Sequence, residues 1–354
     1  MKENLLFTNT IVDINISEIL QKELKNYKNI LIIAGKTAYE KAKNRLNLEN
    51  KNYSINFVKE CSFSVFDEIF HDEIKKTTEF DIVLGIGGGK ALDTAKFVAN
   101  KLKLNILTIP TIAATCAATS GLSVIYDDDS KFLDFAIYDD LNIKCIIDLE
   151  IIKNAPKRFL IAGIGDTMAK FYEFDLKYKM ALKNNEIIDY TNTLGKICSN
   201  LCKDLNLIFA ENAINSKEIN LEFKQVVMSI ILNTGIVSRL IKMDYNGAIA
   251  HSVCYGLGIF SSIEKNFLHG ELVAFGILIQ LLLENNIKEY ELLCEFYKKI
   301  NLPTKITDFI KIDDFMLKIK ESIEFILKTQ DSKYLIKSGF ILNEENLKQA
   351  LLRS

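Results

Sequence analysis

A run of glycines between an apolar strand and a helix is the first stretch of this sequence that could bind a ligand. Residues 81–96 read Asp-Ile-Val-Leu-Gly-Ile-Gly-Gly-Gly-Lys-Ala-Leu-Asp-Thr-Ala-Lys, which predicts a buried strand that passes directly into a helix. Because Gly87, Gly88 and Gly89 have no β-carbon, the backbone can approach a ligand and point free N–H groups at an anion such as a phosphate. The spacing matches neither the G-x-G-x-x-G fingerprint nor the P-loop pattern, so a tight turn without a ligand is an equally good interpretation.

A second set of residues could bind a metal ion. The chain has three histidines, and two of them, His251 and His269, lie in apolar helical stretches with small neighbours. Asp166 stands at the start of another helix that is expected to be buried. Two imidazoles and a carboxylate on separate helices could bind Zn²⁺ or Fe²⁺ and leave positions open for a substrate. Each residue alone has a simpler explanation, as a core histidine or a helix cap. His71 lies among charged residues and is expected at the surface.

The elements around the glycines predict an α/β half. Buried strands are expected at 29–34, 54–58, 82–84, 106–109 and 144–148, and a hairpin at 123–126 and 132–138 around an Asp-Asp-Asp-Ser turn. Thr37 and Glu40 form a capping-box pattern that would start a helix. A further amphipathic helix is indicated by Phe66, Ile69, Phe70 and Ile74. Alternating strands and helices predict a mostly parallel sheet with helices on both faces.

The pattern changes after Pro156. Strand-like runs disappear, and apolar residues repeat near 3.6 positions, as in Ile187, Ile188, Leu194, Ile197, Leu201 and Ile208. We therefore expect an α/β domain over 1–155 and an all-helical domain over 156–354, with a cleft between them.

Composition narrows the class of protein. A chain of 354 residues favours two domains, and a net charge of −2 argues against a nucleic-acid partner. Seven cysteines without a C-x-x-C motif are typical of reduced cytosolic thiols. Neither a signal peptide nor an apolar run of membrane-spanning length is recognisable. We expect a cytoplasmic homo-oligomer that binds a small-molecule substrate and no membrane.

Five motifs in the same order resemble the glycerol dehydrogenase branch of the iron-containing, or group III, alcohol dehydrogenases. They occupy residues 86–96, 109–115, 122–126, 162–167 and 269–276, so the resemblance covers nearly the whole chain. It implies the dehydroquinate synthase-like fold, in which an α/β dinucleotide-binding domain precedes a helical metal-binding domain. It also implies an oxidoreductase that uses NAD or NADP and one divalent metal.

The resemblance assigns residues to roles. It places the metal on Asp166, His251 and His269, where the ion would polarise the substrate oxygen during hydride transfer. Residues along the cofactor diphosphate would be Gly88, Gly89, Lys90 and Asp93. Residues nearer the adenine, ribose and nicotinamide would be Thr111, Ala114, Ser120, Leu122 and Tyr126.

Two departures from the family pattern bear on specificity. Cys116 stands where glycerol dehydrogenases have an aspartate that binds substrate hydroxyls, and Thr-Cys-Ala-Ala is similar to a hydroxycarboxylate dehydrogenase branch that reduces 2-oxo acids. Gly35 and Lys36 stand where NAD-specific relatives have an aspartate on the ribose, which leaves room and positive charge for a 2′-phosphate.

Three other functions remain open. A dehydroquinate synthase-like lyase or a glycerol 1-phosphate dehydrogenase would have the same fold, but Asp166 in place of a glutamate ligand and the lack of clustered arginines count against both. A non-catalytic binding protein would be favoured by loss of a metal ligand, and none is lost.

Overall fold

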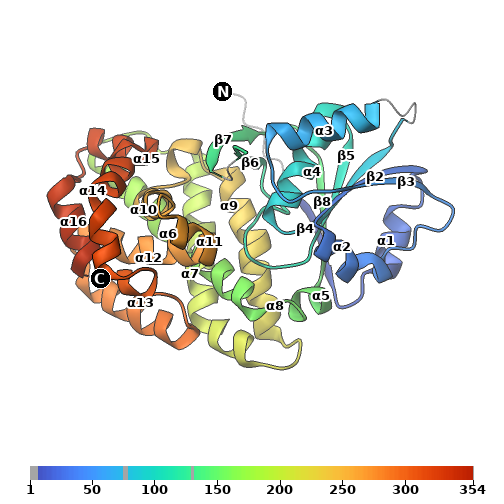
Figure 1. The fold of residues 1–354 in the computed structure, drawn as a ribbon. Coiled ribbons are helices and arrows are strands. Elements are labelled where there is room, and N and C mark those ends of the chain that lie inside the picture. The colour runs from blue at the N-terminus through green and yellow to red at the C-terminus, as the bar shows by residue number, and fades with distance from the viewer. Residues whose placement is uncertain (1–6, 75–78, 129–130, 354) are drawn as a thin grey trace. The chain divides into compact units, whose positions relative to one another are not determined.

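The computed structural model describes residues 7–74, 79–128 and 131–353, and the chain divides into two compact units, Met1–Lys157 and Arg158–Ser354. The first unit is built on a six-stranded sheet in the order β1-β8-β5-β4-β2-β3 (Figure 1). Every pair of neighbouring strands in it is parallel. The strands are β1 (Asn9–Asp13), β2 (Asn29–Ala34), β3 (Asn52–Phe57), β4 (Ile82–Gly87), β5 (Asn105–Pro110) and β8 (Ile143–Asp148). This confirms the predicted parallel sheet.

Helices cover both faces of this sheet because the buried strands are apolar on both sides. Ile30 and Ile32 of β2 pack in one core cluster with α1 (Ser17–Glu23) and α2 (Lys36–Ala42). Leu31 and Ile33 of the same strand belong to the opposite cluster, with α3 (Phe63–Ile74) and α4 (Gly89–Leu102). The alternation along one strand therefore builds two cores.

The carboxyl ends of three strands meet at one edge of the sheet. Gly35 follows β2 and donates its N–H to the carbonyl of Ile86 at 3.2 Å. Thr111 follows β5 and donates to the carbonyl of Gly87 at 3.1 Å. This edge, where ligands bind in open parallel sheets, brings together the predicted cofactor residues of three separate loops.

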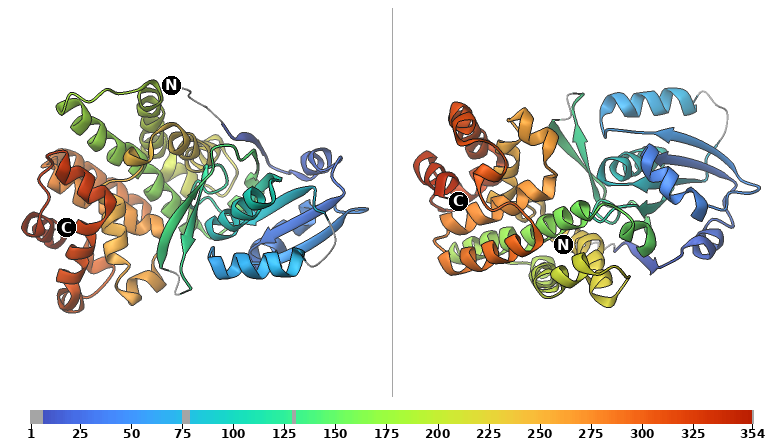
Figure 2. Two further views of the ribbon diagram at one scale, coloured as in Figure 1. Left: turned by 90° about the horizontal axis from the view of Figure 1, so that it is seen from above. Right: turned by 60° about the horizontal axis from the view of Figure 1, so that its bottom comes forward.

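A hairpin stands apart from the sheet in both views of Figure 2. It consists of β6 (Leu122–Tyr126) and β7 (Phe132–Ile137), which pair antiparallel as predicted. Part of the predicted turn, residues 129–130, lies outside the described residues. The first unit ends with the short helix α5 (Leu149–Lys153), whose first turn is capped by the Asp148 carboxylate.

The described part of the second unit is helical, as predicted. Its helices are α6 (Lys157–Lys183), α7 (Tyr190–Asn215), α8 (Leu221–Met228), α9 (Thr234–Leu240), α10 (Ile249–Leu257), α11 (Ser261–Asn266), α12 (His269–Leu283), α13 (Ile287–Ile300), α14 (Ile312–Lys328), α15 (Gln330–Lys337) and α16 (Glu344–Arg353). A π-helical turn, Ser229–Asn233, joins α8 to α9. No helix among the described residues combines the length and the apolar character needed to cross a membrane.

The sequence prediction was wrong or incomplete at two places in the first unit. The capping box at Thr37 and Glu40 is wrong, because Gly35 already accepts the first helical hydrogen bond, from the Tyr39 N–H at 2.9 Å. Helix α2 therefore begins at Lys36. Strand β1 was missed because it is a half-exposed edge strand without a continuous buried run.

Helix α7 forms where its periodicity predicts, but several of its apolar residues are exposed among the described residues. Ile197, Leu201 and Ile208 are exposed to 61%, 45% and 64%. Ile187 and Ile188 precede the helix instead of belonging to it. Periodicity therefore predicted the helix, but it does not show which of its apolar residues are covered.

Candidate metal centre and glycine turn

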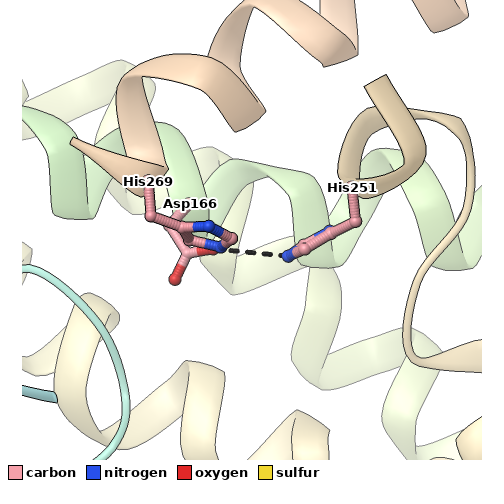
Figure 3. A group of neighbouring side chains, drawn as sticks. All are labelled: Asp166, His251 and His269. Atoms are coloured by element: carbon pink, nitrogen blue, oxygen red, sulfur yellow. Dashed lines mark ion pairs between the residues drawn. The ribbon is translucent and has the colours of Figure 1, made fainter. Parts of the chain in front are cut away.

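Three residues from distant parts of the second unit form a cluster that could hold a metal ion (Figure 3). Asp166 lies within α6, His251 within α10, and His269 is the first residue of α12. One ligand atom of each lies within 4.8 Å of the others. The Asp166 Oδ1 atom is 3.6 Å from His251 Nε2 and 3.5 Å from His269 Nε2.

Glycine lets α12 approach α6 closely enough to bring His269 beside Asp166. A β-carbon on Gly270 would lie 1.9 Å from the carbonyl oxygen of Ala162. From the other helix, a β-carbon on Gly165 would lie 2.4 Å from the carbonyl oxygen of Gly270. Both glycines adjoin a ligand in sequence, so the same backbone contact that joins the helices places the two ligands.

A third glycine sets the approach of α10 to α12. A β-carbon on Gly276 would lie 2.3 Å from the carbonyl oxygen of Ala250, the residue before His251. Each of the three ligands therefore adjoins or nearly adjoins a backbone contact that only a residue without a side chain permits.

The start of α12 is held by an ion pair. Arg158 donates from Nε to Glu271 Oε1 at 2.6 Å and from Nη2 to Glu271 Oε2 at 2.7 Å. Glu271 Oε2 also accepts the backbone N–H of Leu268 at 2.8 Å. Because His269 lies between Leu268 and Glu271, this contact fixes the backbone from which its imidazole projects.

The two imidazoles have different partners at Nδ1, the ring nitrogen that faces away from Asp166. His251 Nδ1 lies 2.6 Å from Glu173 Oε2, and the glutamate is 1% exposed. His269 Nδ1 lies 3.4 Å from the Sγ of Cys254. Neither Glu173 nor Cys254 was singled out from the sequence. Their spacing was the available signal, since Glu173 follows Asp166 by two helical turns and Cys254 follows His251 by almost one.

Contacts within the cluster shift the pKa values of its members in the directions that favour an ionised carboxylate and protonated imidazoles. Burial opposes charge on Asp166, but the two imidazoles outweigh it and lower the pKa of the carboxyl well below its usual range. Burial likewise opposes charge on His251, yet Glu173 and Asp166 raise its pKa to about 9. The pKa of His269 is also raised, because contacts with Cys254 and Asp166 outweigh burial. In the absence of metal, protons therefore occupy the nitrogens that a cation would bind.

The donor set fits a single small divalent ion. Atoms that bind one zinc ion at about 2.0–2.2 Å in a tetrahedral arrangement lie about 3.3–3.6 Å apart. The observed separations of 3.5 and 3.6 Å between the histidine nitrogens and Asp166 Oδ1 are close to this. Imidazole and carboxylate ligands suit Zn²⁺ and Fe²⁺ alike, so the donors do not choose between these metals.

In the first unit, the backbone of the glycine turn at Gly87, Gly88 and Gly89 is not covered by side chains of its own. Gly87 has a φ of 152°, which disfavours a side chain, and a β-carbon there would lie 2.9 Å from that of Ala91. Gly88 is the extended N-cap of α4. A β-carbon on Gly89 would meet nothing nearer than 3.5 Å, at the Thr115 hydroxyl. This geometry leaves the first N–H groups of α4 free of side-chain caps.

Three predicted cofactor residues, Asp93, Ser120 and Leu122, contact one buried lysine just beyond this turn. Lys96, which was not predicted, is fully buried, and its Nζ lies 2.9 Å from Asp93 Oδ1. It also donates to the carbonyl of Leu122 and, at 3.0 Å, to the hydroxyl of Ser120. The other Asp93 oxygen accepts the N–H of Val124 at 3.1 Å. These contacts tie the hairpin to α4.

The remaining predicted cofactor and substrate residues lie near the carboxyl edge of the sheet. Lys90 pairs with Glu60 at 2.6 Å and lies over the Tyr126 ring. Lys36 is exposed at the start of α2. The loop after β5 carries Thr111, which is buried, together with Ala114 and Cys116, which are half-buried. Their assignment to a cofactor or a substrate stays a prediction.

Similarity to known proteins agrees with this architecture. Residues 8–147 match the family model described as iron-containing alcohol dehydrogenase. Hydroxycarboxylate dehydrogenase A from Escherichia coli (strain K12) is 39% identical over 64% of this chain and 62% of its own length. A glycerol dehydrogenase from Escherichia coli O6:H1 is 31% identical over 74% of this chain and 70% of its own length.

The fold is shared over the full chain. The crystal structure of a probable glycerol dehydrogenase from Sinorhizobium meliloti 1021 superposes with a TM-score of 0.84 at 22% identity, covering 99% of this chain and 97% of the other. The sequence match to hydroxycarboxylate dehydrogenase A, in contrast, spans less than two thirds of that protein.

Proposed function

This chain belongs to the iron-containing alcohol dehydrogenase family, and on that premise we propose that it is a metal-dependent oxidoreductase. It would transfer hydride between NAD(H) or NADP(H) and a small polyol or 2-hydroxy acid. The observation that carries the proposal is the convergence of Asp166, His251 and His269, whose ligand atoms lie within 4.8 Å of one another. The comparisons with known proteins confirm the resemblance stated from the sequence at the level of the family.

Different residues of the chain would bind the metal, the cofactor diphosphate and the nicotinamide. A bound metal would supply a Lewis acid that polarises the substrate oxygen. Asp166, His251 and His269 would hold that ion, and the carboxylate would reduce its net charge. The N–H groups at the start of α4, after Gly88, would bind the cofactor diphosphate. Thr111 and the half-buried loop after it would line the space beside the nicotinamide.

For the substrate, we propose a 2-oxo acid and its 2-hydroxy acid in preference to glycerol. Cys116 supplies a thiol, which is a weak hydrogen-bond acceptor, where a carboxylate would bind glycerol hydroxyls. A neutral residue there would also not repel the carboxylate of an acid substrate. The name of hydroxycarboxylate dehydrogenase A, 39% identical over the matched region, supports the same choice.

For the cofactor, we propose that NADPH is used at least as well as NADH. Gly35, at the end of β2, has space beside it, since a β-carbon would meet nothing nearer than the β-carbon of Ala38 at 3.6 Å. Lys36 adds an exposed positive charge at the start of α2. The Gly35→Asp variant should suppress turnover of NADPH much more than that of NADH, because the added carboxylate would repel the 2′-phosphate.

An assay of the purified protein with zinc or ferrous iron tests these proposals. We expect oxidation of NADH and NADPH with 2-oxo acids, loss of activity after chelation, and recovery when metal is returned. The Cys116→Asp variant should shift preference toward dihydroxyacetone and glycerol. A metal-independent activity would contradict the proposed function, whereas highest kcat/KM on glycerol would contradict the substrate assignment alone. The homo-oligomeric state and cytoplasmic location expected from the sequence remain predictions.

A further inference from the structure

Glu173 makes three contacts that converge on the segment carrying His251. Its Oε1 accepts the backbone N–H of Ala248 at 2.7 Å and that of His251 at 2.8 Å. Its Oε2 lies 2.6 Å from the His251 Nδ1. The glutamate is 1% exposed, so bulk water has almost no access to these contacts. One buried side chain thus holds both the start of α10 and the imidazole projecting from it.

We propose that Glu173 is the positioning residue of the metal centre, which fixes His251 in the form that binds metal through Nε2. This inference rests on the proposed metal-dependent function. An ionised carboxylate can only accept hydrogen bonds, so the nitrogen facing it must carry the proton. A neutral imidazole protonated at Nδ1 has its lone pair at Nε2, the atom that lies 3.6 Å from Asp166 Oδ1.

The second histidine lacks an equivalent partner. His269 Nδ1 faces the Cys254 Sγ at 3.4 Å, and sulfur is a weak acceptor. The side chain of His269 is 41% exposed, against 13% for His251. The two ligands are therefore unequal, with His251 held in place before metal binds and His269 less constrained.

The Glu173→Gln variant replaces the hydrogen-bond acceptor that faces His251 Nδ1 with a donor of nearly the same shape. Two backbone N–H groups face the position of Oε1, so the amide oxygen of glutamine should occupy that position. Its NH₂ group would then face His251 Nδ1 and donate to it. That contact favours the imidazole protonated at Nε2, which has no lone pair for the metal.

A nearby carboxylate provides the matched control. Asp331 is close enough to Glu173 and His251 for their charges to influence its pKa, but it pairs with Lys177 Nζ at 2.6 Å. The Asp331→Asn variant therefore removes a negative charge from the same region and leaves the hydrogen bond to the imidazole intact. A purely electrostatic effect would appear in both variants, and a positioning effect in Glu173→Gln alone.

The test is the zinc dissociation constant, measured by competition with a chromophoric chelator on the metal-free proteins. We expect binding to Glu173→Gln to be weaker by about 10- to 100-fold, the usual effect of losing a partner of a ligating histidine. Asp331→Asn should bind zinc like the wild type. Equal affinity in Glu173→Gln and wild type, or equal weakening in both variants, would overturn the inference. A wild type that fails to bind zinc or ferrous iron would instead refute the proposed function.

A measurement on the wild type keeps the inference testable if Glu173→Gln does not fold. The chain has three histidines, so the nitrogen NMR spectrum of the zinc-loaded, ¹⁵N-histidine-labelled protein is simple. Substituting His71 leaves the signals of His251 and His269, which backbone connectivities then distinguish without removing a ligand. We expect His251 to be protonated at Nδ1 and bound to zinc through Nε2. Zinc bound through Nδ1 would contradict the role given to Glu173.

Discussion

The two candidate sites are built from different kinds of atoms. The glycine turn of the first unit offers backbone N–H groups, and the charged side chains beside it are already paired, Asp93 with Lys96 and Lys90 with Glu60. The metal centre of the second unit offers side chains, and close backbone contacts at glycines such as Gly270 hold them together. A local motif can therefore form the first site, whereas the second requires three helices to pack at fixed distances.

Replacement of Lys96 should have the largest effect on stability and should spare the metal centre. In Lys96→Met the buried carboxylate of Asp93 would lose its countercharge, which costs about 3–5 kcal/mol of unfolding free energy. Denaturant unfolding measures this loss, and zinc binding by the second unit should be unchanged. The double variant Asp93→Asn, Lys96→Met should regain part of the stability. A single variant as stable as the wild type would show that the ion pair does not hold the first unit.

Replacing one glycine with alanine in each unit should show that Gly270 is needed for helix packing and Gly89 for access of the cofactor. Gly270→Ala places a methyl 1.9 Å from a backbone oxygen, so the helices must separate. We expect a loss of about 1–3 kcal/mol and weaker zinc binding. Gly89→Ala meets nothing nearer than 3.5 Å, so stability should be retained while the methyl weakens NAD(P)H binding. Denaturant unfolding measures the stability of both variants, and titration with zinc or with NAD(P)H measures binding. An unchanged zinc affinity in Gly270→Ala would contradict the packing argument.

The stability of the metal-free protein and its affinity for zinc should change with pH in opposite directions. This effect should be smaller than those of the substitutions above. Glu173 and Asp166 outweigh burial and raise the pKa of His251 to about 9. Because this folded-state pKa exceeds the unfolded value of about 6.5, the stabilisation is full below about pH 6.5 and is lost as pH rises through about 9. Zinc needs neutral imidazoles, so its affinity should instead fall toward about pH 6.

Thermal unfolding across this range, with and without chelator, measures the two trends. The metal-free His251→Gln variant is the control, since it should lose the contribution of this imidazole. Stability of the metal-free wild type that increases between about pH 6.5 and 9, relative to this control, would mean that the imidazole is not paired as the structure shows.

The sequence predicted the sheet and its glycine turn better than the packing around the candidate metal centre. The strands at 29–34 and 82–84 are continuous apolar runs, so the parallel sheet and the glycine turn follow from local pattern. Strand β1 lies half-exposed at the sheet edge and left no such run. Exposed Ile197 and Ile208 on α7 show that periodicity marks an apolar side without showing that the chain covers it.

The three candidate metal ligands are separated by 85 and 18 positions, so no spacing rule joins them. Residue type made them candidates, and the family resemblance assigned them to one metal site. The contacts that bring them close are equally hidden in the sequence. Gly270 and Gly276 were visible as residues of a motif, but the backbone oxygens they approach lie on other helices. Glu173 lay within reach of helical spacing from Asp166, yet its role depends on the loop before α10.

The metal content of the purified protein tests the central claim most directly. The wild type, reconstituted with zinc or ferrous iron and freed of excess, should hold one metal ion per chain by elemental analysis, at Asp166, His251 and His269. The His269→Ala variant should remain folded, because that side chain is 41% exposed, and should retain almost no metal. Full occupancy in folded His269→Ala would contradict the assignment of the three ligands.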